Sequence, residues 1–200
     1  MTKKRRGPAS RPTWRDVPVK VLHGREKLTF ALRAFAVDVA GRVALDLGAA
    51  AGGFTTALLA AGARRVYAVD AGYGQLVGSL RQDPRVVNLE RTNLGMLDTR
   101  LVPDPVDVVS VDLSYLSITD ALPQLVSIEL APRAELVALV KPMFELHLAG
   151  LPVEPFAGLV DALRTAGEGA RASGWQVAAA CGSPVLGHHG AVEGFLHAHR

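Results

Sequence analysis

The sequence predicts an α/β protein built on a doubly wound, mostly parallel sheet of seven strands with an antiparallel last strand. Three observations support this fold class. Apolar, β-rich runs alternate with segments of helical character, polar residues rarely interrupt these runs, and only a turn separates the final two. Nearly unbroken apolar runs are typical of parallel strands that are buried on both faces. With 200 residues, 49% of them hydrophobic, the chain is long enough to bury its own core.

The expected elements follow one another in a regular order. A helix is expected in "GREKLTFALRAFAV", with Lys27 in its first turn, because apolar residues recur at helical spacing at Leu28, Leu32, Phe35 and Ala36. Five strands are expected at "RVALDL", "RRVYAVD", "RVVNLE", "VDVVSVD" and "ELVALVK". Helices are expected between them at "GGFTTALLAAG", "YGQLVGSLRQD" and "SITDALPQLVSIEL". This alternation predicts right-handed crossovers between neighbouring strands.

The last part of the chain has a different pattern. A long helix from about Glu154 to Ser173 precedes the run "WQVAAACG", a Gly-rich turn and the closing run "AVEGFLHAHR". We expect the last two runs to be antiparallel neighbours, with Glu193 inside the closing strand. We also expect residues 1–22 to form a basic arm and residues 23–200 to form one domain.

Charge is distributed unevenly along the chain. Residues 1–27 carry nine basic and two acidic side chains, whereas the rest carries 13 basic and 17 acidic ones. Together with Trp14, the basic arm predicts contact with nucleic acid, although such tails also serve solubility alone. The single cysteine, Cys181, excludes an internal disulfide. No apolar run reaches the roughly 18 residues of a membrane span, so we expect a cytoplasmic protein without a membrane partner.

The loop after the first expected strand contains only glycine and alanine, in the sequence "GAAAGG". Such small residues allow a ligand to lie against the backbone. The spacing differs from the dinucleotide and P-loop patterns, which argues against a pyrophosphate. Asp70 ends the second strand, where an acidic residue can accept both hydroxyls of a ribose. These features predict S-adenosylmethionine, the alternative being that Asp46 and Asp70 only cap helices.

The segment "DLGAAAGGFTTALLAAGARRVYAVDAGYGQL", with "LERTN", "VDLSYLS", "LVKPMFE" and "GAVEGFL", resembles the FtsJ-like ribose methyltransferases, particularly the TlyA or haemolysin A branch. The resemblance runs from about Gly24 to the last residue. It implies a Rossmann-like class I methyltransferase that uses S-adenosylmethionine to methylate the 2′-hydroxyl of RNA. In that branch the RNA is ribosomal, so the implied partner is ribosomal RNA or a ribosomal subunit.

The resemblance also assigns residues. It implies a catalytic set of Lys27, Asp112, Lys141 and Glu193. It implies cofactor contacts, to which the strand-end Asp46 is added from its position, at Asp46, Gly48, Ala49, Gly52, Gly53, Phe54, Asp70, Asn93 and Asp112.

The implied catalytic set suits the chemistry, because a ribose hydroxyl is a poor nucleophile that needs activation and alignment. An ammonium beside the oxygen stabilises a developing alkoxide, and a neutral amine can accept its proton. We therefore assign this part to Lys141, held by Asp112, with Lys27 and Glu193 completing the network.

Each assignment has an alternative. Lys27 is a solvated helix residue on pattern alone, and Asp112 with Lys141 can form a purely structural ion pair. Glu145 competes with Glu193 because it is nearer to Lys141 in sequence. We prefer Glu193, since a charge within an apolar strand needs a reason.

Other site classes receive little support. His188, His189, His197 and His199 have no nearby cysteine or carboxylate pair, so we expect no metal site. Ser114 and Ser117 lack the motif of a hydrolase nucleophile.

Two features depart from the resemblance. Members of the TlyA branch usually carry an S4-type RNA-binding domain before the catalytic domain, whereas only the basic arm stands there in this chain. The segment "LHLAGLPVEP" replaces a Gly-rich loop after the fifth strand. These departures leave open a non-catalytic RNA-binding relative. A haemolysin is disfavoured, because no strongly amphipathic basic helix is present.

Overall fold

A computed structural model describes residues 23–150 and 154–200; the predicted basic arm, residues 1–22, lies outside these residues. The helices are α1 (His23–Ala34), α2 (Gly53–Ala60), α3 (Gly78–Arg81), α4 (Ile118–Ala121), α5 (Pro142–Glu145) and α6 (Pro155–Ala172), with 3₁₀ turns η2 (Leu94–Met96), η3 (Leu122–Leu125) and η4 (His188–Gly190). The strands are β1 (Val43–Leu47), β2 (Arg65–Asp70), β3 (Val86–Glu90), β4 (Val106–Val111), β5 (Leu130–Val140), β6 (Gln176–Gly182) and β7 (Gly194–His199).

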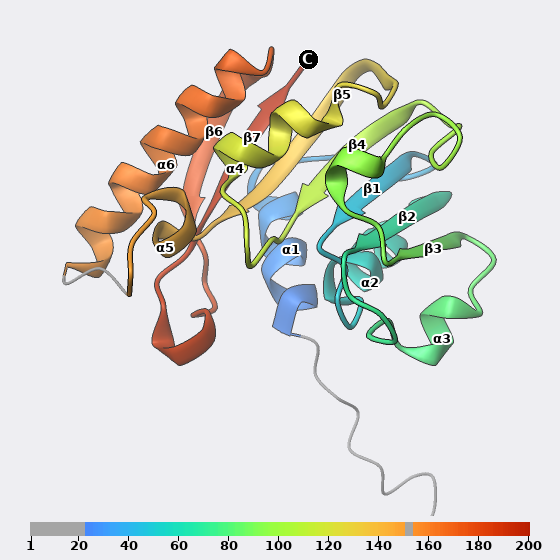
Figure 1. Cartoon of the computed structure of the whole chain (residues 1–200), viewed down its shortest axis with the longest axis horizontal. Helices are drawn as coiled ribbons and strands as arrows, with labels where there is room; N and C mark the ends of the chain where they lie inside the picture. The colour runs from blue at the N-terminus through green and yellow to red at the C-terminus, as the bar shows by residue number, and fades with distance from the viewer. Residues whose placement is uncertain (1–22, 151–153) are drawn as a thin grey trace, which may run out of the picture.

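The seven strands form one sheet in the order β3-β2-β1-β4-β5-β7-β6 (Figure 1). Neighbouring strands are parallel in the part β3-β2-β1-β4-β5. Strand β7 is antiparallel to both of its neighbours, β5 and β6. The predicted fold class is confirmed, including the antiparallel pairing of the last two strands. The strand order reverses between β1 and β4, which is where ligands bind in doubly wound sheets.

Helices cover both faces of the sheet (Figure 1). One face packs on α4, η3 and α6, and its core contains Leu45, Val111 and Val140. The other face packs on α1 and α2, and its core contains Val108 and Leu139. Because successive side chains of a strand point to opposite faces, the even-numbered residues of β1 and of β4 from Val108 on face α1 and α2. The odd-numbered residues of β5 and β7 face the same helices. Val106 lies on the other face, because β4 is irregular between Val106 and Val108.

Two expected helices are shorter than predicted. Of the segment 73–83, only α3 is helical, because Glu90 accepts hydrogen bonds from the backbone of Gln75 and Leu76 and holds that stretch as a loop. The segment 117–130 divides into α4 and η3, with Pro123 at the start of the second turn. The helices α1, α2 and α6 agree with expectation within a few residues, whereas the single turn α5 was not predicted.

The strand boundaries matter more for the site. β5 begins at Leu130, earlier than expected, and ends at Val140, so Lys141 directly follows it. β7 begins at Gly194, so the prediction that Glu193 lies inside the closing strand is wrong by one residue. Glu193 directly precedes the strand, and it is nevertheless buried, with only 5% of its surface exposed.

Candidate active site

The loop between β1 and α2 is built for close contact with neighbouring backbone. The amides of Gly48 and Ala49 both donate to the carbonyl of Val69 on β2, at 2.9 and 3.0 Å. Gly48 has a φ of +86°, and a Cβ there would lie 2.2 Å from the carbonyl oxygen of Asp112. Only glycine fits such a position, since a side chain would collide with the end of β4.

The second half of this loop anchors α2. Gly52 occupies the N-cap with a φ of 98°. A Cβ on Gly53 would lie 2.9 Å from the Cα of Gly24, so α1 and α2 touch at their first turns. Phe54 is buried and stacks on Phe195, with ring centroids 6.3 Å apart, so it turns its ring to the core. Phe54 therefore offers the loop only its backbone.

Asp70 ties the cofactor loop to the end of β2. Its carboxylate accepts hydrogen bonds from the backbone N–H of Ala50 at 2.8 Å and of Gly72 at 2.6 Å. Each carboxylate oxygen has more than one lone pair, so a hydroxyl can be accepted beside these amides. Asn93, the other residue expected on this side, is exposed at the start of η2.

Tyr115, which the sequence analysis did not single out, lies in the loop after β4. Burial raises the pKa of the Tyr115 hydroxyl, and the charge of Asp70 raises it further. Even so, Tyr115 remains 54% exposed. Tyr115 also lines a groove together with Met143 and Phe144 of α5.

Glu90 at the end of β3 also escaped the sequence analysis. Hydrogen bonds from the backbone of Leu76 above all, with those from Gly74 and Gln75, lower its pKa to about 2. Its carboxylate also pairs with Arg81 at 2.9 Å. Glu90 therefore holds the β2–α3 loop next to Asp70 in a fixed conformation.

Asp46 is fully buried below the loop. It accepts hydrogen bonds from the hydroxyls of Thr55 at 2.6 Å and Ser110 at 2.9 Å, which link β1 to α2 and β4. Burial raises its pKa to about 6 against the opposing effect of these two hydrogen bonds, and the charge of Asp112 adds to the rise. Asp46 thus supports the loop from beneath, and its side chain has no surface open to a ligand.

The four expected catalytic residues form two ion pairs, Lys141 with Asp112 and Lys27 with Glu193. Lys141 Nζ lies 2.6 Å from Asp112 Oδ1 and donates to Ser114 Oγ at 2.9 Å. Lys27 Nζ lies 2.5 Å from Glu193 Oε2, with both side chains less than a tenth exposed. A Cβ on Gly187 would lie 2.1 Å from Glu193 Oε1, so the β6–β7 loop covers the second pair.

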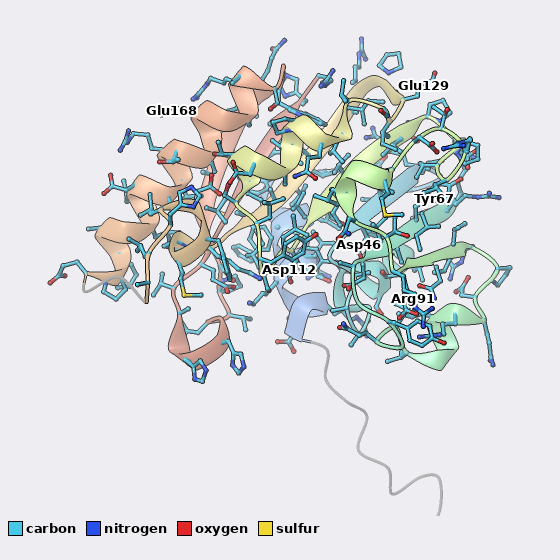
Figure 2. All side chains as sticks on the ribbon, in the orientation of Figure 1. Asp46, Tyr67, Arg91, Asp112, Glu129 and Glu168 are labelled. Carbon is cyan, nitrogen blue, oxygen red and sulfur yellow. The ribbon has the colours of Figure 1, made fainter. Side chains whose placement is uncertain are left out.

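The sheet register places both pairs at the same edge. Val140 on β5 is paired with Gly194 on β7, so Lys141 and Glu193 stand at the next position outward. Asp112 follows Val111, which is paired with Ala138 of the same β5. By the alternation of side chains, all of them face α1, as do Asp46 and Ser110. Figure 2 shows Asp46 and Asp112 near the middle of the molecule, away from Glu168 on α6.

Glu145 is engaged elsewhere. It is 2% exposed and accepts hydrogen bonds from the backbone of Ile118 and Thr119 and from the Thr119 hydroxyl. Its carboxylate is therefore used between α5 and α4, on the opposite face of the sheet from α1. This geometry supports the preference for Glu193 over Glu145.

The histidines are scattered. His188 and His189 stack on each other at 4.4 Å, and His197 pairs with Glu135 at 2.7 Å. Within residues 23–150 and 154–200, no group of three His, Cys, Asp or Glu side chains is arranged to hold a metal ion. The helices of the same residues include none that is long and apolar enough to span a membrane.

Comparisons with known proteins identify relatives. The family model described as FtsJ-like methyltransferase matches residues 23–153. The 16S/23S rRNA (cytidine-2′-O)-methyltransferase TlyA of Mycobacterium tuberculosis is 45% identical over 181 residues, which cover 88% of this chain and 67% of that protein. This chain therefore spans about two thirds of the length of that relative.

Solved structures agree with the sequence matches. A "putative hemolysin" from Streptococcus thermophilus has a TM-score of 0.82 and 36% identity, covering 89% of this chain and 66% of that one. Magnesium protoporphyrin IX methyltransferase from Synechocystis, solved with bound SAH, has a TM-score of 0.60 at 17% identity, covering 96% and 90%. The second likeness shows the fold alone.

Proposed function

Because the chain belongs to the FtsJ-like methyltransferase family, we propose that it transfers a methyl group from S-adenosylmethionine to a ribose 2′-hydroxyl of ribosomal RNA. The observation that carries this proposal is the arrangement of Asp112–Lys141 and Lys27–Glu193 on one face, at the edge where the small-residue loop lies. The name of the Mycobacterium tuberculosis relative supports the choice of ribosomal RNA.

The cofactor of this methyltransferase is S-adenosylmethionine, and the loop fits it. Gly48 leaves no room for a side chain, Ala49 is small, and Asp70 presents a carboxylate to a ribose. The residues proposed to hold the cofactor are Gly48, Ala49, Gly52, Gly53, Asp70, Asn93 and the backbone of Phe54. When bound, S-adenosylmethionine supplies a methyl group on a positively charged sulfur.

Lys141 is the group proposed to act on the ribose hydroxyl. Its side chain is held from two sides, by Asp112 and by Ser114, so its nitrogen has a defined position at the edge of the sheet. As an ammonium paired with Asp112, it can stabilise the developing negative charge on the 2′-oxygen. To take up the hydroxyl proton, Lys141 must first release a proton to solvent and react as the neutral amine. A positioned general acid or base contributes about 10²- to 10⁴-fold to a rate.

The second ion pair is proposed to hold the ribose in place. Lys27 and Glu193 are shielded from water, where charge-assisted hydrogen bonds are short and directional. Holding the nucleophile in line with the methyl group reduces the entropy cost of the reaction. Glu193 also contacts the β6–β7 loop, so that loop is placed next to the substrate ribose.

Recognition of the RNA is proposed to begin with its phosphates. Segment 1–22 carries seven basic side chains and one acidic side chain, whereas residues 23–200 carry 15 basic and 18 acidic ones. The net positive charge that attracts phosphates therefore lies in this segment. We propose that this arm contacts RNA or a ribosomal subunit, and that the enzyme acts in the cytoplasm.

Methyl transfer from tritiated S-adenosylmethionine to free ribosomal RNA and to isolated ribosomal subunits tests the proposal. We expect label in at least one of these substrates, and a loss of about 10²-fold or more in kcat for Lys141→Ala. Arg164→Ala is the matched control, because Arg164 is exposed on α6, away from the site. Absence of label in every substrate would refute the proposal.

The same preparation separates the other readings. RNA binding with a steep salt dependence but no methyl transfer would indicate a non-catalytic relative. Lysis of red cells by the purified protein would indicate the activity that the word hemolysin describes. Neither result is expected.

A further inference from the structure

The loops that follow β4 and β5 are joined at two levels. At the edge of the sheet, Lys141 contacts Asp112 and Ser114. One turn further along both loops, Glu145 accepts hydrogen bonds from Ile118 N at 2.7 Å, Thr119 N at 3.2 Å and Thr119 Oγ1 at 2.5 Å. Glu145 therefore connects the segment that carries Lys141 with the segment that carries its two partners.

Glu145 acts from inside the protein. Its side chain is 2% exposed, and its hydrogen bonds named above all come from the first two residues of α4. A buried carboxylate is tolerated when such donors satisfy it. Because it is buried, Glu145 has no surface with which to touch RNA or a cofactor.

The two joined segments are also the walls of a groove. It has a volume of about 290 Å³, and its lining includes Tyr115 and Ser117 on one side and Met143, Phe144 and His147 on the other. The distance between these walls is set by the contacts between the segments, and Glu145 makes three of them.

We propose that Glu145 is a positioning residue for methyl transfer. It fixes the loop after β4 against α5, so that Ser114 and Asp112 meet Lys141 and the groove keeps its width. This inference rests on the proposed function. It assigns to Glu145 an effect on turnover and on RNA. The expected effect on cofactor binding is small, because the loop from Gly48 to Gly53 is held by its own hydrogen bonds to Val69 and Asp70.

The contact with α6 indicates that α4 would stay folded without Glu145. A Cβ on Gly169 of α6 would lie 2.5 Å from Thr119 Oγ1, so the helices pack closely there. Thr119 Oγ1 also lies 3.4 Å from the carbonyl of Thr165. The expected consequence of losing Glu145 is therefore a local displacement of the loop.

Two variants test the inference independently. Glu145→Gln replaces one acceptor oxygen by a donor, which opposes the backbone N–H groups of α4. Thr119→Val removes only the hydroxyl at constant shape. We expect kcat to fall about tenfold or more in each and the KM for RNA to rise, while the Kd for S-adenosylmethionine, measured by calorimetry, stays within about twofold.

Two matched variants control for stability and for the site of substitution. Thr119→Ser keeps the hydroxyl and is expected to retain wild-type kcat. Tyr67→Phe removes a comparable side-chain hydrogen bond, from Tyr67 to Asp104 at 2.6 Å, near the start of β4 at the opposite edge of the sheet. The double variant Glu145→Gln with Ser114→Ala is expected to be no slower than the slower of the two single variants. Both changes disturb the contact of Lys141 with the loop after β4.

The outcomes are distinguishable. One outcome has a wild type that transfers methyl groups, an inactive Lys141→Ala, and Glu145→Gln and Thr119→Val variants that are as fast as Tyr67→Phe at the same melting temperature. That outcome would refute the positioning role of Glu145 and leave the proposed function standing. Equal losses in Thr119→Ser and Thr119→Val would also refute it. A wild type that transfers no methyl group would overturn the proposed function, and this inference with it.

Discussion

The buried pair between Lys27 and Glu193 provides a quantitative test of the site. Glu193→Ala would leave the Lys27 ammonium buried without its partner, since the two side chains are only 9% and 5% exposed. Breaking a buried pair by removing one partner typically costs about 3–5 kcal/mol. At about 2–4 °C per kcal/mol for a chain of this size, we expect the melting temperature to fall by roughly 6–20 °C.

The double variant Lys27→Met with Glu193→Leu separates charge from packing. Replacing both charges by apolar side chains of similar volume is often neutral or stabilising, so we expect its unfolding free energy to return to within about 1 kcal/mol of wild type. The assay is urea denaturation of the wild type, of the single variants Lys27→Met and Glu193→Leu, and of the double variant. Methyl transfer measured on the same samples should remain lost in the double variant, because the ribose would lack its contacts.

Three results would contradict this reasoning. A single variant that loses less than about 1 kcal/mol would mean that water reaches the remaining charge. A double variant as unstable as the single ones would mean that packing, and not the unpaired charge, dominates the cost. Full activity of the double variant would remove the pair from the proposed mechanism.

Three further substitutions test the loop and its support. The pKa of Asp46 is about 6 in the folded protein and 3.8 in the unfolded chain, so the native state binds more protons between these values. As pH rises from 4 to 6, the wild type should therefore lose up to about 3 kcal/mol of stability relative to Asp46→Asn, measured by urea denaturation. Parallel stability curves of the two proteins across this range would disprove the prediction. Gly48→Ala should cost about 3 kcal/mol or more and weaken cofactor binding, because its Cβ would lie 2.2 Å from the Asp112 carbonyl; an unchanged melting temperature and Kd would show that the loop can shift. Asp70→Ala should weaken S-adenosylmethionine binding about tenfold or more in calorimetry by freeing the amides of Ala50 and Gly72, and an unchanged Kd would exclude Asp70 from the cofactor site.

The sequence predicted the sheet well because the signal was local. Apolar runs bounded by charged residues marked the strands, and Asp70, Asp112 and Lys141 were expected where strands end, which is where they stand or directly follow. The helices at 73–83 and 117–130 were overestimated because tertiary contacts act there. Glu90 and Glu145 satisfy backbone groups in these segments from elsewhere in the chain, and no local pattern reveals that.

The pairing of side chains was less predictable than their positions. Lys27 and Glu193 are 166 residues apart, and only the resemblance to a family joined them before the structure did. Nothing in the spacing indicated that Ser110 and Thr55 would occupy both oxygens of Asp46. These contacts depend on strand order, which a single sequence does not contain.

The antiparallel direction of β7 has a consequence for the timing of folding. Because β7 runs opposite to β5, the residue before its first position reaches the edge where the parallel strands finish, and the site is closed by a segment that follows β1 to β5 in the chain. Contacts of such long sequence separation form slowly, since a large loop must be closed first. A chain still emerging during translation can assemble the β1 to β5 half early, yet Lys27 gains its partner Glu193 only when the chain has grown 166 residues further. Enzyme activity should therefore appear only after the segment that carries Glu193 has joined the β1 to β5 half.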